Sequence, residues 1–424
     1  MSETTLIALA LVIFGWSVGS EWFAERNLSG PLLFLGAGLL LANPSWGVVS
    51  VDVESATVHH LAEITLALLL FADASAVPLA AARRDLPLTA RLLGLGLPLT
   101  IALGIAMALV LFPSLPVALA GLVAASLAPT DAALSASVIA DERLPLRVRR
   151  VLNVESGLND GIATPVVTFC IASAATALGV VAHTYDSGVG AFGELAIGVA
   201  TGGLLALVGG GVVRITHARG WMDHGSRRLA TLALAVMAFL IAGEVGGNPF
   251  VSAFIGGLVF GASARADAPA AVELTELTGT LLSLVLWFIF GAGFVVPAFE
   301  EIDLRTALYA ILSLTVVRMV PVAISLLGSG TSRQATAFVG WFGPRGLASV
   351  VFGLLIVEEL PTDDPGVQTV LAVIVLTVLL SVLAHGVSGR PLSRWMAGQA
   401  EPDARSGEVA TRPRAPFGQA PTAD

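Results

Sequence analysis

Residues 126–135 and 152–165 read SLAPTDAALS and LNVESGLNDGIATP, and they place three carboxylates, Asp131, Glu155 and Asp160, among apolar residues. An ionised carboxylate is costly to bury unless it is paired, hydrogen-bonded or bound to a cation. Ionisable side chains inside membrane segments are rare, and they mark ion pathways or charge pairs. The two stretches therefore predict an ion site within a membrane-embedded helical domain.

The composition of the whole chain agrees with an integral membrane protein. Of 424 residues, 55% are hydrophobic and 12% are charged, and the mean hydropathy is +0.86; soluble domains are about 25% charged. The opening MSETT has no basic residue and no small-residue cleavage site follows it, so we expect no cleavable signal.

Several function classes are excluded by residues that the chain lacks. All 22 basic residues are arginines, which rules out a P-loop lysine or a Schiff-base lysine. Cys170 is the sole cysteine, so an intrachain disulfide or a cysteine-built zinc site is impossible. A formal charge of −9 gives no basic face for nucleic acid. We predict no cofactor and no enzymatic activity.

Apolar runs of about 15 to 25 residues, close to the length that crosses a bilayer, recur along the chain. There are thirteen, near residues 5–22, 30–43, 60–76, 92–113, 115–140, 149–177, 190–213, 229–246, 249–263, 276–297, 305–328, 333–358 and 366–388. We expect an all-α polytopic protein with a transmembrane domain over residues 1–390. Residues 391–424, rich in Pro, Ala, Gly and charge, cannot bury enough apolar surface to fold and predict a flexible tail.

The positions of the arginines test the number of spans, because cytoplasmic loops are enriched in basic residues. Loops after odd-numbered spans and the tail hold Arg26, Arg83, Arg84, Arg91, Arg143, Arg147, Arg149, Arg150, Arg214, Arg219, Arg227, Arg228, Arg265, Arg333, Arg390, Arg394, Arg405, Arg412 and Arg414, whereas the other side holds only Arg305. The alternation predicts an external N-terminus and a cytoplasmic C-terminus in the cytoplasmic (inner) membrane. Arg318 and Arg345 remain inside spans.

Spans five and twelve contain residues that interrupt a helix. Ala128-Pro129-Thr130-Asp131 lies in span five, and the stretch 343–346, Gly-Pro-Arg-Gly, lies in span twelve. Proline removes a donor and clashes one turn back, and glycine loosens the backbone. Interrupted spans in matching halves point to an inverted-repeat transporter with its site at the bilayer midplane. A proline kink with purely structural pairing is the alternative reading, and the ionisable residues at both kinks favour the functional one.

Span six carries a polar face. Ser156 and Asp160 are one helical turn apart, Asn159 is next to Asp160, and Glu155 points about 140° away from Asp160. The two carboxylates should therefore have different neighbours. Glu155 needs a cationic partner, with Arg318 as the first candidate and Arg345 as the second, and Arg345 could also offset exposed carbonyl ends at a break.

Asp160 has no dedicated cation of its own in this scheme. Its carboxylate, the Ser156 hydroxyl, the Thr130 backbone carbonyl and water held by Asp131 could supply oxygen ligands to Na⁺, a small hard cation. When no cation is bound, burial favours a proton on the same carboxylate. One carboxylate with two competing ligands is sufficient for exchange.

The motifs APTDAALS, NVESGLNDGIATP, VVRMVP and GWFGPRGLASV together resemble the NhaP-type sodium/proton antiporters of the monovalent cation:proton antiporter 1 family, which includes the animal sodium/proton exchangers. The resemblance covers the thirteen spans and is most specific in ESGLND and its spacing to PTD. It implies electroneutral one-for-one exchange of Na⁺ or Li⁺ for H⁺, a role in pH homeostasis, a homodimer, and an elevator-like movement of the domain with the broken helices.

The resemblance also implies roles for individual residues. Asp160 would bind the ion beside Asn159, where electrogenic relatives carry a second aspartate, and Glu155 would pair with Arg318. Many relatives read Thr-Asp-Pro at the first break, whereas this chain has Pro129 before Thr130 and Ala132 after Asp131. This difference bears on the carbonyl geometry of the first break.

The remaining signals are weaker. Asp73 and Glu244, at span ends, could contribute to an ion funnel, although charges there more often extend to the interface. His385 has a side chain suited to pH sensing, but a hydrogen-bonded structural role fits it better. His59 and His60 are adjacent in sequence and do not share a helix face, which argues against a metal site.

Three other functions are compatible with buried acids. A K⁺/H⁺ antiporter of the same fold is the nearest, since oxygen ligands serve both ions. A cation channel fits less well, because the breaks favour alternating access. An intramembrane aspartyl protease would need a Gly-x-Gly-Asp signature, which the chain lacks.

Overall fold

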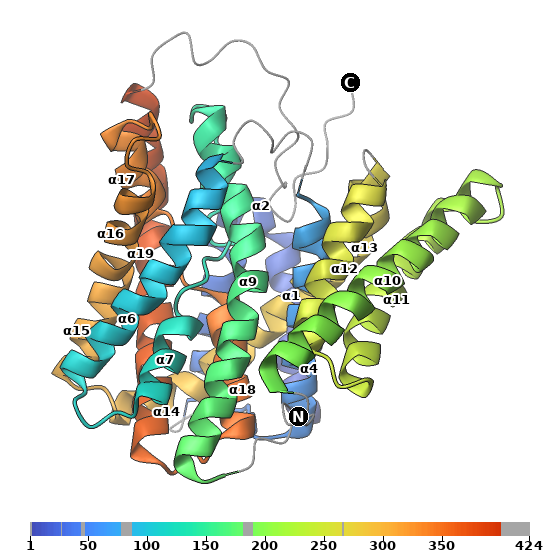
Figure 1. Ribbon diagram of the computed structural model, residues 1–424. Coiled ribbons are helices and arrows are strands. Elements are labelled where there is room, and N and C mark those ends of the chain that lie inside the picture. Colours follow the sequence, from blue (N-terminus) through green and yellow to red (C-terminus); the bar gives the residue numbers. More distant parts are fainter. Residues whose placement is uncertain are drawn as a thin grey trace.

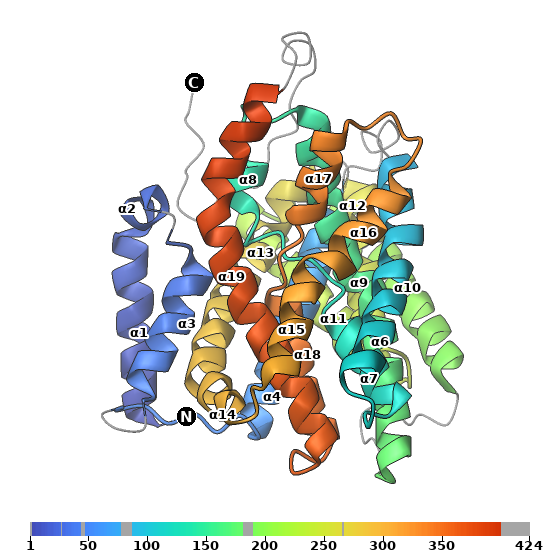
Figure 2. The same cartoon turned by 90° about the vertical axis from the view of Figure 1, so that its left-hand side faces the viewer.

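The computed structural model describes residues 2–26, 28–43, 47–77, 87–180, 190–264 and 267–399, and within these ranges all regular structure is helical. The helices run mostly up and down in one bundle (Figure 1). Helices α1 and α10 lie at opposite edges of the bundle (Figure 2).

Besides the two interrupted spans and span eleven, which is described below, twelve helices of the described ranges build the bundle. They are α1 (Glu3–Val18), α2 (Ser20–Glu25), α3 (Gly30–Leu41), α4 (Ala56–Ser75), α6 (Leu97–Leu111), α9 (Leu146–Leu178), α10 (Gly190–Ala218), α11 (His224–Glu244), α12 (Pro249–Ala264), α13 (Ala268–Ile289), α14 (Val295–Glu300) and α19 (Pro365–Gln399). Two π-helical turns, η1 (Leu92–Gly96) and η3 (Phe290–Phe294), continue into α6 and α14. The interrupted spans are formed by α7 (Val117–Ser126) with α8 (Ala136–Ile139), and by α17 (Arg333–Trp341) with α18 (Leu347–Glu359).

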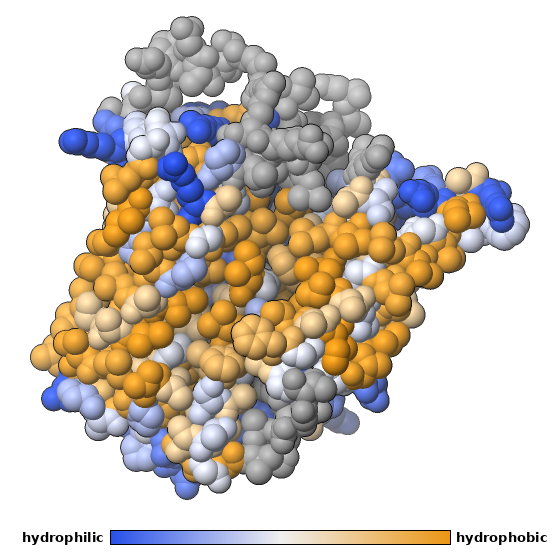
Figure 3. All heavy atoms as spheres, viewed as in Figure 1, coloured by the Kyte–Doolittle hydropathy of each residue, from blue (hydrophilic) through white to orange (hydrophobic). Residues whose placement is uncertain are grey.

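The surface is that of a membrane protein. Eight helical segments in the described ranges are long and apolar enough to cross a bilayer, and shorter apolar helices accompany them. On the face shown in Figure 3, a broad apolar belt covers the middle of the bundle, and hydrophilic side chains gather at its two ends. On α10, the large side chains Phe192, Leu204 and Leu207 are among the exposed residues of this belt. All thirteen predicted spans coincide with a helix or a pair of helices.

Small residues allow the helices to approach closely. A Cβ added at Gly202 of α10 would strike the backbone of Ser252 in α12, and one added at Gly257 of α12 would strike the backbone of Phe71 in α4. In a bilayer, where apolar burial does not drive helix association, this close packing is a main source of stability. Helix α12 is therefore held between α10 and α4 by glycines.

Three spans differ from the sequence prediction. Span eleven is divided into α15 (Leu304–Leu314) and α16 (Val316–Ser325) at Thr315, where ψ is −89°. Pro321 lies inside α16 and cannot donate to the preceding turn, which explains the weakened helix upstream. The second half of span five is a series of turns and the four-residue α8, rather than a half-helix.

The end of span thirteen also differs. We predicted a flexible tail from residue 391, but α19 continues through Pro391 to Gln399. Residues 400–424 of that tail, with Arg405, Arg412 and Arg414, lie outside the described residues, as do the loop residues Arg83, Arg84 and Arg265. The ordered part is thus longer than the apolar pattern indicates.

Candidate functional site

The first break, residues 127–135, separates α7 from α8. Residues 129–131 have no regular secondary structure, and residues 132–135 form turns. The Asp131 carboxylate stabilises these turns, since its Oδ1 accepts the backbone N–H groups of Ala133 at 2.7 Å and Leu134 at 3.1 Å. Aspartate commonly forms such local bonds, which replace the missing helix.

The second break, residues 342–346, separates α17 from α18 and lies against the first. The Asp131 N–H donates to the Pro344 carbonyl at 2.8 Å, and the Leu347 N–H donates to Asp131 Oδ2 at 2.8 Å. Leu347 is the first residue of α18, so the Asp131 carboxylate serves as the N-terminal cap of a helix from another span. Gly346 permits this contact, because an added Cβ would collide with the Asp131 carboxylate.

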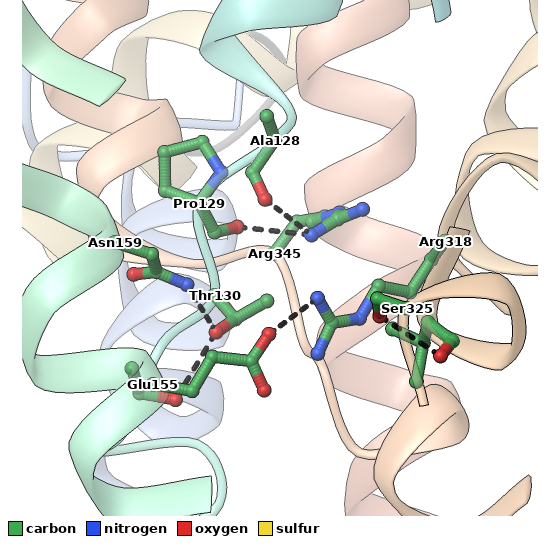
Figure 4. A network of polar contacts seen from close by, with 10 residues as sticks. Ala128, Pro129, Thr130, Glu155, Asn159, Arg318, Ser325 and Arg345 are labelled. Atoms are coloured by element: carbon green, nitrogen blue, oxygen red, sulfur yellow. Dashed lines mark hydrogen bonds and ion pairs between the residues drawn. The ribbon is translucent and has the colours of Figure 1, made fainter. Parts of the chain in front are cut away.

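Arg345 makes the reciprocal contact. Its fully buried side chain donates from Nη1 to the carbonyls of Ala128 at 2.8 Å and Pro129 at 3.1 Å (Figure 4). The Ser349 hydroxyl donates to the Ser126 carbonyl at 2.7 Å. The carbonyl groups released at the end of α7 thus find donors in the second break and in α18, as sequence analysis expected of Arg345.

The polar face of α9 contacts the first break. Asn159 Nδ2 donates to Thr130 Oγ1 at 2.6 Å, and Thr130 Oγ1 lies 3.1 Å from Ser156 Oγ (Figure 4). Thr130, Ser156 and Asn159 are each at most 3% exposed. Asp160, the next residue on α9, is half-buried. Four of the five residues predicted for the ion site therefore lie side by side, namely Thr130, Ser156, Asn159 and Asp160. The fifth, Asp131, is the residue after Thr130.

Glu155 faces a different neighbour, as the helical geometry predicts. Its Oε1 lies 2.6 Å from Arg318 Nη1 of α16, and both side chains are almost fully buried (Figure 4). A Cβ added at Gly343 would strike the Arg318 guanidinium, so this ion pair lies directly against the second break. Of the two arginines that sequence analysis left as partners, the one in ion-pair contact is Arg318.

Asp73 was underestimated from the sequence. It is half-buried near the end of α4, and a Cβ placed on Gly157 of α9 would be 3.9 Å from the Asp73 Cβ. Gly157 precedes Asp160 by three residues, on a neighbouring face of the same helix. Asp73 is also close enough for its charge to act on Asp131. In the sequence, Asp73 is an acid within the apolar stretch LLLFADAS. The same pattern is equally typical of a charge at the membrane interface.

The other charged candidates lie elsewhere. Glu244, the last residue of α11, is exposed, in line with an interfacial charge. His59 is buried with Nδ1 3.7 Å from Glu358 Oε1, whereas the exposed His60 lies 3.7 Å from Glu63 Oε2. The adjacent histidines thus have separate partners. His385 contacts the second break.

The combined geometry places oxygen atoms of four kinds around one end of the first break: carboxylate, hydroxyl, amide and backbone carbonyl. These are ligands for hard monovalent cations, and none is a soft donor. The two guanidinium groups are held by Glu155 and by backbone carbonyls. The arrangement thus offers the type of oxygen ligands that a hard cation requires.

Comparison with known families gives one match over nearly the whole chain. Residues 7–395 match the transmembrane domain of the sodium/hydrogen exchangers. The fold is similar to that of the sodium proton antiporter MjNhaP1 from Methanocaldococcus jannaschii, with a TM-score of 0.74 at 18% identity over 90% of this chain and 98% of that one.

Curated relatives have lower coverage. The Na⁺/H⁺ antiporter NhaH of Halobacillus dabanensis is 29% identical over 66% of this chain and 68% of its own length. The K⁺/H⁺ antiporter NhaP2 of Shewanella sp. (strain ANA-3) is 23% identical over 84% and 61%. The uncharacterized Na⁺/H⁺ exchanger YjcE of Escherichia coli is 26% identical over 58% and 44%. The matched segments thus span about half to two thirds of these relatives.

Proposed function

The chain belongs to the sodium/hydrogen exchanger family, and we propose that it exchanges Na⁺ or Li⁺ for H⁺, one for one, with Asp160 binding either ion. The family and the fold are those of cation/proton antiporters, which are transporters and not enzymes. The observation that carries the proposal is the contact of Thr130 with Ser156 and Asn159, which places the first break beside Asp160.

Competition at Asp160 provides the coupling. A bound Na⁺ would be held by the carboxylate together with Ser156 and the Thr130 carbonyl, and through water by Asp131. A proton needs only one carboxylate oxygen and removes the charge that attracts the cation. The two ligands exclude each other, so the site carries either Na⁺ or H⁺ at any time. Alternating access, in which the site opens to one side of the membrane at a time, then couples the two fluxes.

The neutral Asn159 determines the charge that is moved. With one titrating carboxylate, the occupied site has the same charge whether it carries H⁺ or Na⁺. The exchange rate should then be independent of membrane potential, which otherwise contributes about 2.3 kcal/mol per charge per 100 mV. The fixed pair Glu155–Arg318 adds no net charge.

We further propose a homodimer in the cytoplasmic membrane, with the N-terminus outside and the C-terminus in the cytoplasm. The one-sided distribution of arginines supports this orientation. The apolar belt on the face shown in Figure 3 would lie against the lipid bilayer.

K⁺/H⁺ exchange is the second candidate. It is favoured by the similarity to NhaP2, which covers 84% of this chain. Oxygen ligands accept both ions, so the choice depends on the size of the coordination shell.

The test is ion exchange in liposomes, with internal pH followed after addition of Na⁺, Li⁺ or K⁺ at a clamped potential. Wild type should move protons with Na⁺ or Li⁺ at a rate that potential leaves unchanged. Asp160→Asn should be silent, and Asp363→Asn, the same change at an exposed loop position, should retain the activity. Exchange by Asp160→Asn would reject Asp160 as the carrier, and exchange with K⁺ alone would select the second candidate.

A further inference from the structure

The second break leaves backbone groups at both of its ends. Trp341 is the last residue of α17, and its carbonyl, past the end of the helical ladder, accepts the Gly343 N–H at 2.8 Å and retains a second lone pair. Arg345 lies just before α18, and its N–H has no helical acceptor. The Arg345 N–H is buried and needs an acceptor from the protein, and the part-buried Trp341 carbonyl can accept a second hydrogen bond.

Helix α19 supplies these partners from one face. Ser381 Oγ accepts the Arg345 N–H at 2.7 Å, and His385 Nε2 lies 2.8 Å from the Trp341 carbonyl. One turn further, Ser388 Oγ accepts the Trp341 indole N–H at 2.9 Å. The three residues are spaced by four and three positions, which aligns them along the helix. We call them the α19 stripe.

The stripe is packed as well as hydrogen-bonded. Ser381 is fully buried and His385 is 4% exposed. The imidazole lies against the Trp341 ring at a centroid distance of 5.3 Å and against Phe342 at 6.2 Å. Its orientation is therefore restricted on both sides.

Both ring nitrogens of His385 lie 2.8 Å from a backbone carbonyl oxygen, and we assign the proton of the neutral ring to Nε2, because Nδ1 has the Ser381 hydroxyl as a neighbour that can donate to it. A carbonyl oxygen only accepts, so the Trp341 contact requires a proton on Nε2. Nδ1 lies 2.8 Å from the Ser381 carbonyl and 3.3 Å from the Ser381 hydroxyl. A neutral ring accepts from the hydroxyl at Nδ1, and a protonated ring donates to the carbonyl there. The Nε2–H bond to Trp341 is present in either state.

We propose that Ser381 and His385 are positioning residues for cation binding, a role that rests on the proposed function. By fixing both ends of the second break, they keep Arg345 directed at the Ala128 and Pro129 carbonyls, which adjoin Thr130. A cation needs several oxygens at set distances, whereas a proton needs one. Loss of the stripe should weaken cation binding and leave proton binding at Asp160 unchanged.

The test compares two isosteric replacements. Glutamine places its amide nitrogen near the position of histidine Nε2, whereas asparagine places it near Nδ1. We expect His385→Gln to keep the apparent KM for the cation within about twofold. His385→Asn, which removes the side-chain donor to the Trp341 carbonyl, and Ser381→Ala, which removes the acceptor of the buried Arg345 N–H, should each raise it about tenfold. The proton midpoint of the site, measured in the absence of the cation, should be the same in all variants.

Thr369→Ala is the matched control, because Thr369 bonds only the Pro365 carbonyl of its own helix and is exposed. Equal, unchanged KM values in His385→Asn and His385→Gln would overturn the proposal. A shift of the cation-free proton midpoint together with the KM would also overturn it, since that pattern indicates general distortion.

A measurement on wild type separates this proposal from the carrier role of Asp160. The ¹⁵N resonances of labelled His385, assigned by their loss in His385→Gln or by sequential assignment in wild type, should report a proton on Nε2 between pH 6 and 9. A ring protonated only on Nδ1 would overturn the proposal, whatever Asp160→Asn does. If the variants do not fold, this measurement decides alone.

Discussion

Gly346 shows how one missing atom shapes the site. The Asp131 carboxylate occupies the space where a Cβ would lie, while it accepts the Leu347 N–H. Any other residue would displace the carboxylate from the start of α18. Gly386 of α19, in contrast, has open space around the position of a Cβ.

We predict that Gly346→Ala abolishes exchange and lowers thermal stability. Overpacking in a close-packed interior costs about 1–3 kcal/mol. Thermal unfolding in detergent, followed by size-exclusion chromatography, measures the effect. Gly386→Ala is the control and should unfold at or above the wild-type temperature; equal stability of the two variants would contradict the steric reading.

Asn159 supplies a second prediction for a single residue. Asn159→Asp adds a carboxylate beside Asp160 and removes the amide donor to Thr130. If both acids load protons, each cycle moves an unequal charge, so exchange should become dependent on membrane potential. The same liposome assay at two clamped potentials measures this, and Asn159→Ala separates the added charge from the lost amide. If the exchange rate of Asn159→Asp is independent of membrane potential, residue 159 does not determine whether exchange is electroneutral.

Individual residues of the site were predictable to different degrees. Helical spacing places Ser156 beside Asp160 and separates Glu155 from it, and the structure agrees. The partner of Glu155 could be narrowed only to two arginines, because the packing of α16 against the second break depends on tertiary structure. Asp73 lies on another helix, and spacing along one chain segment carries no information about that contact.

The buried pair between α9 and α16 makes a prediction about helix packing. Removing one partner leaves an uncompensated buried charge, which costs about 3–5 kcal/mol. Glu155→Gln and Arg318→Met should each destabilise strongly, and the double variant should be less destabilised than the sum of the two. A double-mutant cycle on unfolding measures the coupling, and strict additivity would contradict the ion pair.

The start of α15 makes a prediction about pH. Asp303 accepts the N–H and the hydroxyl of Thr306 at 2.7 and 2.8 Å, and these bonds hold the pKa of its carboxyl below the ordinary 3.8. A lowered folded-state pKa contributes stability above the ordinary value, and this stability is lost as pH falls through the lower folded value. Asp303→Asn should keep the cap and lose this dependence below about pH 4.

Unfolding temperatures of wild type and Asp303→Asn between pH 3 and 6 provide the measurement. The two curves should be parallel above pH 5 and converge below pH 4. Parallel curves over the full range would reject a cap that depends on the carboxylate charge.

Helix boundaries followed the apolar pattern except where local chemistry intervened. Proline and glycine identified both breaks. The division at Thr315 was missed, because Pro321 acts several residues before its own position. The continuation of α19 to Gln399 was missed because its last turns are amphipathic and carry Arg390 and Arg394, so hydropathy ends earlier than the helix.

For the molecule as a whole, the proposed orientation in the membrane is testable with a single-cysteine background. In Cys170→Ala, a cysteine at Arg219, between α10 and α11, should react with an impermeant maleimide only after permeabilisation. A cysteine at Glu301, after α14, should react in intact cells. Both positions are exposed, so access alone differs. The opposite result would invert the topology.

The two breaks exchange bonds in both directions: Asp131 of the first caps α18, and Arg345 of the second caps α7. Neither break is complete by itself, so a change in one break should require a matching change in the other. A chimaera that takes residues 117–178 from a distant relative and keeps residues 333–359 should fail at this crossing, even if each part is functional in its own parent. Recombination between such genes should therefore preserve function only when both segments come from the same parent.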